Sequence, residues 1–101
     1  MSKELVNFLN LLKRSNSLVI GLDSLTKSRR KVNLLLVNES VSSNTIKKIE
    51  HIASVREIPL IYLKESDFVE FSSSKVACIG ISNLNGAKKI LEIIKEGDSN
   101  E

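Results

Sequence analysis

The chain of 101 residues has few of the side chains on which enzyme and cofactor sites depend. It contains no tryptophan, one tyrosine, three phenylalanines, one histidine and one cysteine. Stacking platforms for single-stranded nucleic acid therefore have little to be built from. A single cysteine can form neither an intramolecular disulfide nor a cysteine-rich metal site. We expect no enzyme active site, no cofactor and no bound metal.

Long apolar runs are also absent. No stretch approaches the ~18 to 20 residues that span a bilayer. The N-terminal segment mixes polar and apolar residues and lacks the apolar core and the small-residue cleavage site of a signal peptide. These features predict a cytoplasmic protein without membrane contact. The cysteine, Cys78, lies inside the apolar run from Val76 to Ile81, which predicts a buried side chain rather than a reactive thiol.

What the chain does contain is typical of one globular domain. Hydrophobic residues make up 42% and charged residues 27%, close to the averages for such proteins. A chain of this length is the usual size of a single domain. We expect one domain over residues 1–97 and a frayed polar tail at 98–101.

Extended and helical patterns alternate along the chain. Strands are expected at four apolar runs, which are Leu18 to Ile20, Val32 to Val37, Leu60 to Leu63 and Val76 to Ile81. Helices are expected before the first strand and after each strand: an opening helix with Leu5, Leu9 and Leu12 inward, one from about Asp23 to Arg30, one that begins within Val41 to Thr45, a very short one capped by Ser66 or Asp67, and one capped by Ser82 or Asn83. This order predicts an α/β fold, a three-layer α/β/α sandwich with a four-stranded mixed, mainly parallel sheet and about five helices.

Ligands of such folds gather at the loops that follow the strands. The expected loops are Gly21 to Asp23, Asn38 to Ser43, Lys64 to Asp67 and Ser82 to Asn85. The first begins a stretch, Gly21 to Ser28, that misses the phosphate-binding pattern G-x-x-x-x-G-K-[ST] by one residue, because Thr26 replaces the second glycine. A nucleotide-binding loop is therefore a minor alternative. The single histidine, His51, has no neighbours with metal-ligand spacing, which favours a solvated helix residue.

Positive charge is concentrated in the first half of the chain. Up to residue 50 there are nine Lys and Arg against four Asp and Glu, whereas the rest has six against eight. Lys27, Arg29, Arg30 and Lys31 lie close to the Gly21 turn in sequence. Such a cluster near a helix start suits a nucleic-acid backbone, although an ordinary solvated basic face would look the same.

Several stretches of the chain are similar to one known family. These are Phe8 to Ser15, Leu18 to Gly21, Leu34 to Glu39, Ile58 to Leu60, Val76 to Ile81, Asn85 to Leu91 and, most specifically, Ser42 to Ile49, which is similar to a bacterial S-x-N-T-x-K-K-I helix start. Over nearly its whole length the chain resembles the kink-turn RNA-binding ribosomal protein superfamily, the L-seven-Ae and L-thirty-e group, and most closely its small bacterial YlxQ-type members.

The resemblance implies a non-enzymatic RNA-binding protein of translation that contacts structured RNA, such as ribosomal RNA or the ribosome, by shape and backbone. In the family, RNA is held by the turn and helix start after the first strand and by a loop after the third strand. Carried over, the RNA-binding residues are Gly21, Asp23, Ser24 and Lys27, to which the charge pattern adds Arg29, Arg30 and Lys31, and the loop after the third strand adds Lys64.

The chain departs from the family pattern at two places. It has Asp23-Ser24 where the strongest binders have Asn-Glu, and Ser66 to Phe71 replaces a glycine-containing element. These departures, with the acids Glu65, Asp67 and Glu70, motivate an alternative: a divergent member that has lost kink-turn binding and acts as a protein-interaction module in ribosome assembly or translation. The sequence does not predict the oligomeric state.

Overall fold

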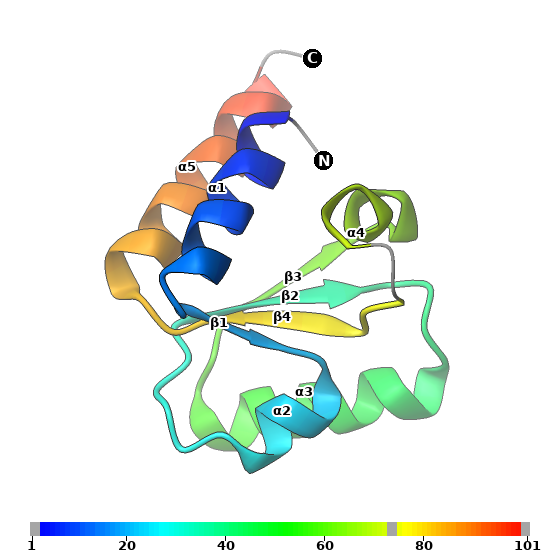
Figure 1. Cartoon of the computed structure of the whole chain (residues 1–101). Coiled ribbons are helices and arrows are strands. Elements are labelled where there is room, and N and C mark those ends of the chain that lie inside the picture. Colours follow the sequence, from blue (N-terminus) through cyan, green and yellow to red (C-terminus); the bar gives the residue numbers. More distant parts are fainter. Residues whose placement is uncertain (1–2, 73–74, 100–101) are drawn as a thin grey trace.

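Five helices and four strands alternate along the part of the chain that the computed structural model describes, residues 3–72 and 75–99 (Figure 1). The helices are α1 (Lys3–Arg14), α2 (Leu22–Lys27), α3 (Ser43–Arg56), α4 (Glu65–Phe71) and α5 (Leu84–Ser99). The strands are β1 (Leu18–Ile20), β2 (Leu34–Asn38), β3 (Leu60–Leu63) and β4 (Cys78–Ile81). The order expected from the sequence, a helix followed by alternating strands and helices, is confirmed.

The sheet lies between two layers of helices (Figure 1). α1, α4 and α5 cover one face, and α2 and α3 cover the other. Successive side chains of a strand point to opposite faces, so Leu34 and Leu36 of β2 join the apolar cluster under α1 and α5, whereas Leu35 and Val37 join the cluster under α2 and α3. All four are fully buried, as a central strand covered on both faces requires. The three-layer α/β/α sandwich is confirmed.

The strand order is β1-β4-β2-β3. β2 pairs with β3 in parallel, whereas β4 pairs antiparallel with both of its neighbours, β1 and β2. The sheet is therefore mixed, with β1, β2 and β3 running in one direction. The expectation of mainly parallel neighbours is wrong, because two of the three described strand pairs are antiparallel. β4 runs in the opposite direction because α4 stays beside the end of β3 and the chain enters β4 from that same end (Figure 1).

The direction of β4 changes which loops can meet. The loops after β1, β2 and β3 share one end of the sheet, but the expected Ser82 to Asn85 loop follows β4 and lies at the other end. The segment before β4, which includes Lys75, takes its place at the carboxyl ends of the other three strands. The antiparallel direction of β4 therefore brings Lys75 to the end of the sheet where β1 finishes.

Some helix ends differ from their predictions. Ser42 caps α3 by accepting a 3.2 Å hydrogen bond from the Thr45 amide, as expected. α2 ends at Lys27 rather than Arg30, because Ser28 adopts extended backbone angles. Asp67 does not cap α4 from outside: it lies within the first turn and accepts from the Lys64 amide at 3.1 Å. α5 continues to Ser99, so the expected tail begins inside a helix, and residues 100–101 lie outside the described part of the chain.

Candidate nucleic-acid interface

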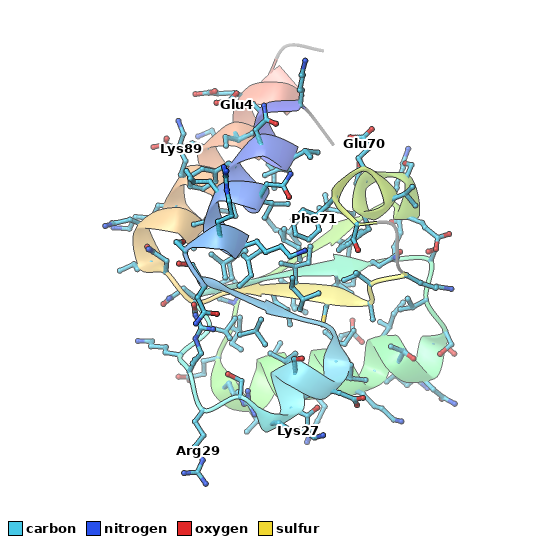
Figure 2. The ribbon with its side chains drawn as sticks, viewed as in Figure 1. Glu4, Lys27, Arg29, Glu70, Phe71 and Lys89 are labelled. Carbon is cyan, nitrogen blue, oxygen red and sulfur yellow. The ribbon has the colours of Figure 1, made fainter. Side chains whose placement is uncertain are left out.

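The predicted basic region extends along α2 from one end of the sheet to the other. Gly21, Asp23 and Ser24 follow β1 directly, and α2 then runs back for about 9 Å. Lys27 ends that helix, and Arg29 to Lys31 belong to the connection that leads to the start of β2. Figure 2 shows the Lys27 and Arg29 side chains projecting away from the sheet on the α2 side. The sequence cluster is thus one strip along α2 rather than one compact patch.

A hollow of about 450 Å³ opens at the carboxyl end of β1, and we call it the Gly21 hollow. Gly21, Asp23 and Ser24 line it from the turn and the start of α2, Thr45 lines it from α3, and Lys75 lines it from the segment before β4. The structure therefore brings together three predicted site residues and two that sequence reasoning missed. Lys75 becomes recognisable only once β4 is known to run antiparallel, because a parallel β4 would begin at the other end of the sheet.

The backbone of Gly21 is held firmly while its outer side is open. Its φ of 91° lies where L side chains are rarely found. The Gly21 amide donates to the Cys78 carbonyl at 2.9 Å, and its carbonyl accepts from the Leu25 amide at 3.0 Å. Apart from Gly21 itself and its two chain neighbours, no described residue has a heavy atom within 4 Å of the position that a Cβ would take. Because glycine has no side chain, a ligand can approach the backbone here more closely than it could if another residue type stood at this position.

Asn38 fixes the segment that carries Lys75. Its side chain is fully buried at the end of β2, and its Nδ2 donates to the Val76 carbonyl at 3.1 Å. Its Oδ1 accepts from the Ser40 amide at 3.0 Å and from the Ser40 hydroxyl at 2.6 Å. A buried side-chain amide whose donor and acceptor both have hydrogen-bond partners holds the two loops that it connects in one arrangement. Asn38 thereby holds the residue next to Lys75 against the sheet.

Lys75 and Lys64 both lie at the end of the sheet where β1 finishes, but only Lys75 lines the Gly21 hollow. The Lys75 ammonium lies 4.0 Å from a Glu65 carboxylate oxygen, but the two side chains are 65% and 47% exposed, and such exposed pairs contribute little to stability. Lys75 can therefore exchange this partner for a stronger anion. Lys64 follows β3, at the opposite edge of the sheet, which is about 14 Å from β1 by strand spacing. Lys64 shares this end of the molecule but does not line the Gly21 hollow.

Arg30 has partners within the chain. Its guanidinium donates to the Asn16 carbonyl, to the Leu18 carbonyl at 3.5 Å and to the Ser82 hydroxyl at 2.6 Å. By contrast, no ion pair holds the Lys27, Arg29 or Lys31 side chain to another described residue. The geometry therefore gives Arg30 a structural role and leaves its neighbours exposed.

The nucleotide-binding alternative has no support in the geometry of α2. In a phosphate-binding loop the glycine-rich stretch precedes the helix and the lysine lies at the helix start. Here α2 begins at Leu22, directly after Gly21, and Lys27 is its last residue. Within the described ranges, no group of three or more His, Cys, Asp or Glu side chains is arranged to hold a metal ion. None of the helices described is long and apolar enough to cross a membrane.

Among the described residues, two titratable groups have perturbed pKa values. Cys78 is fully buried, as predicted, and burial raises the pKa of its thiol to about 11, although the backbone of Gly21 lowers it in part. The Tyr62 hydroxyl donates to the Glu50 carboxylate, and this hydrogen bond, with partial burial and the charge of Glu50, raises the pKa of Tyr62 above 10.0. Neither group lines the Gly21 hollow.

The segment that replaces the family's glycine-containing element forms α4. Phe68 and Phe71 point into the core, so these bulky side chains do not stand in the way of a ligand. Asp67 is tied to the start of the helix, and Glu65 lies near Lys75. The third acid that motivates the protein-interaction alternative, Glu70, is exposed and projects away from α4 (Figure 2).

Comparison with known proteins gives the fold alone. No model of a protein family matches the chain, and no curated protein sequence matches it. A solved structure of a protein of unknown function from Bacillus halodurans is similar, with a TM-score of 0.73 and 16% sequence identity. The similarity covers 93% of this chain and 99% of that one. The arrangement of helices and strands is therefore shared with a bacterial protein across nearly the whole domain.

Proposed function

We propose that this protein is a non-enzymatic RNA-binding protein that holds structured RNA at the Gly21 hollow. The observation that supports the proposal best is the meeting of an open glycine backbone with Lys75 in one hollow, at the end of a rigid sheet. An exposed backbone lets a sugar or phosphate approach closely, and a lysine beside it supplies the countercharge. Asp23 and Ser24 offer acceptors and one hydroxyl donor to base or sugar edges.

The exposed cations extend this contact along α2. Lys27 and Arg29 project on the same side of the molecule (Figure 2), and Lys31 follows them. Contacts of this kind position a backbone without reading its sequence. Recognition would then depend on the shape of a bent stem, which agrees with the resemblance to the kink-turn-binding superfamily. The RNA would be ribosomal or another structured RNA, and the protein would act in the cytoplasm.

Filter binding with a kink-turn RNA and a straight duplex of the same base composition tests this function. At ~50 mM salt we expect micromolar or tighter binding to the kink-turn and weaker binding to the duplex. Gly21→Val should weaken kink-turn binding because its side chain would occupy the open approach and strain the backbone.

The matched control is the Lys88→Ala, Lys89→Ala double variant, which removes two exposed lysines from α5 on the other side of the sheet. The double variant Lys27→Ala, Lys75→Ala should lose affinity roughly tenfold more than this control. No binding to either RNA, or equal losses in the two double variants, would contradict the proposed function.

The protein-interaction alternative has one observation in its favour. Val69 on α4 is 63% exposed and stands next to the exposed Glu70. Affinity capture from cell extract with and without ribonuclease distinguishes the two functions. Partners retained after ribonuclease treatment, and lost in the Val69→Ser variant, would favour a protein contact through α4. Partners lost after ribonuclease treatment would favour RNA.

A further inference from the structure

A second hollow, of about 510 Å³, lies between α2 and α3, and we call it the α2–α3 hollow. Leu22 from α2 and Ile52 from α3 give it apolar walls, and both side chains pack against the buried cluster on this face of the sheet. Thr26 also lines it, but its hydroxyl already donates to the Leu22 carbonyl at 2.9 Å. Its size is within the usual range for small-ligand sites, although it is open to solvent.

Its other lining residues are mostly basic. Lys47 and His51 are four residues apart on α3, so they lie on the same side of that helix, and Lys48 lies beside them. None of the three takes part in an ion pair with another described residue. Across from them, Asp23 supplies a single carboxylate from α2. The hollow thus combines apolar walls, two lysines, one flat ring and one acceptor.

The α2–α3 hollow adjoins the Gly21 hollow. Leu22 and Asp23 line both of them, one on each side of the start of α2. A chain of phosphates that leaves the Gly21 hollow on this side therefore reaches Lys47 and Lys48 next. A free phosphate would use the lysines but leave the apolar walls without a partner, whereas a nucleotide of an RNA strand would use both.

We propose that the α2–α3 hollow binds one ribonucleotide of the RNA that the Gly21 hollow holds, an inference that rests on the proposed function. Its phosphate contacts Lys47 and Lys48, and its base packs between Leu22 and Ile52 with the His51 ring beside it. The Asp23 carboxylate accepts a hydrogen bond from a ribose hydroxyl, which DNA lacks at the 2′ position. Such a site would select RNA with a single-stranded nucleotide next to the bent stem.

The test uses the whole protein and a kink-turn RNA with or without a short single-stranded extension of 4-thiouridine. Irradiation should link the extension to the peptide that contains His51 and Ile52. Lys47→Ala, Lys48→Ala should weaken binding of the extended RNA roughly tenfold and lower its salt slope by about 2. The same variant should bind the RNA without the extension like the wild type. Lys88→Ala, Lys89→Ala, the matched pair on α5, should affect neither RNA.

The outcomes separate this inference from the function on which it rests. If the kink-turn RNA binds but the extension adds no affinity, or crosslinks only outside α3, the α2–α3 hollow is not a nucleotide site and the proposed function stands. If neither RNA binds, both proposals are overturned. An extension of deoxyuridine that binds as well as the ribonucleotide form would contradict the role given to Asp23.

Discussion

The guanidinium of Arg30 donates a 2.6 Å hydrogen bond to the hydroxyl of Ser82, which lies 52 positions further along the chain. The same guanidinium also donates to the carbonyls of Asn16 and Leu18. One side chain therefore joins the connection after α2 to the start of β1 and the end of β4. These contacts hold the connection after α2 against the edge strand β1. They therefore fix the position of the basic residues in that connection.

Arg30→Ala should therefore destabilise the fold. Hydrogen bonds to a charged group contribute about 1.5 to 3 kcal/mol when shielded, and because Arg30 is exposed we expect a loss of about 1 kcal/mol. Its neighbour Arg29 has no ion pair with another described residue, and Arg29→Ala should change stability by less than about 0.5 kcal/mol. Urea denaturation of the two variants measures the difference. Equal stabilities would show that the Arg30 contacts contribute nothing to folding.

Glu50→Gln should lower the pKa of Tyr62. The Glu50 carboxylate accepts the hydrogen bond from the Tyr62 hydroxyl and opposes ionisation of the phenol, so the neutral amide removes the repulsion. The chain has a single tyrosine and no tryptophan, so the ultraviolet absorbance of the phenolate reports this group directly. A titration curve that does not move in the variant would rule out the contact.

The Cys78 thiol should be inert in the folded protein and should make stability depend on alkaline pH. Its folded pKa of about 11 exceeds the ordinary 9.0, so the unfolded chain loses this proton first. The contribution is complete below pH 9 and decreases as the pH rises towards 11. A thiol reagent at pH 8 should react only after denaturant is added, and Cys78→Ala should flatten the alkaline part of the stability curve. Rapid modification of the native protein would contradict the burial.

Asn38→Ala should loosen the segment before β4. The change leaves the Val76 carbonyl without its partner and removes the acceptor of two Ser40 bonds, and we expect a loss of about 2 kcal/mol. Ser40→Ala removes only one of these bonds and should cost less. Thermal unfolding compares the two variants. RNA affinity should also fall in Asn38→Ala at temperatures where it is still folded, because Lys75 loses its support.

Much of the fold follows from local sequence patterns. β2 is predictable because an uninterrupted apolar run from Leu34 to Val37 suits a strand covered on both faces. The start of α3 is predictable because Ser42 caps it with its own side chain. The direction of β4 is not, because whether the chain crosses the sheet before Val76 depends on where α4 packs, and no short stretch of sequence records that.

The candidate site was predictable to a smaller extent. Gly21 is recognisable because a strand that ends in glycine often turns with a positive φ, and it does so here. Lys75 was missed because its place depends on the direction of β4. Arg30 is predicted as an RNA contact from its charge, whereas its partners within the chain come from three separate segments and are not recognisable in the sequence.

The measurement that tests the central claim most directly is amide chemical-shift mapping of the protein titrated with a kink-turn RNA. If RNA binds as proposed, the largest shifts will fall on Gly21 to Lys27 and Lys75 to Ala77, and the outer face of α5 will not respond. Because the two helical layers lie on opposite sides of the sheet, the two results cannot be confused. Shifts concentrated on α1 and α5, or no shifts at micromolar protein and low salt, would contradict RNA binding at the Gly21 hollow.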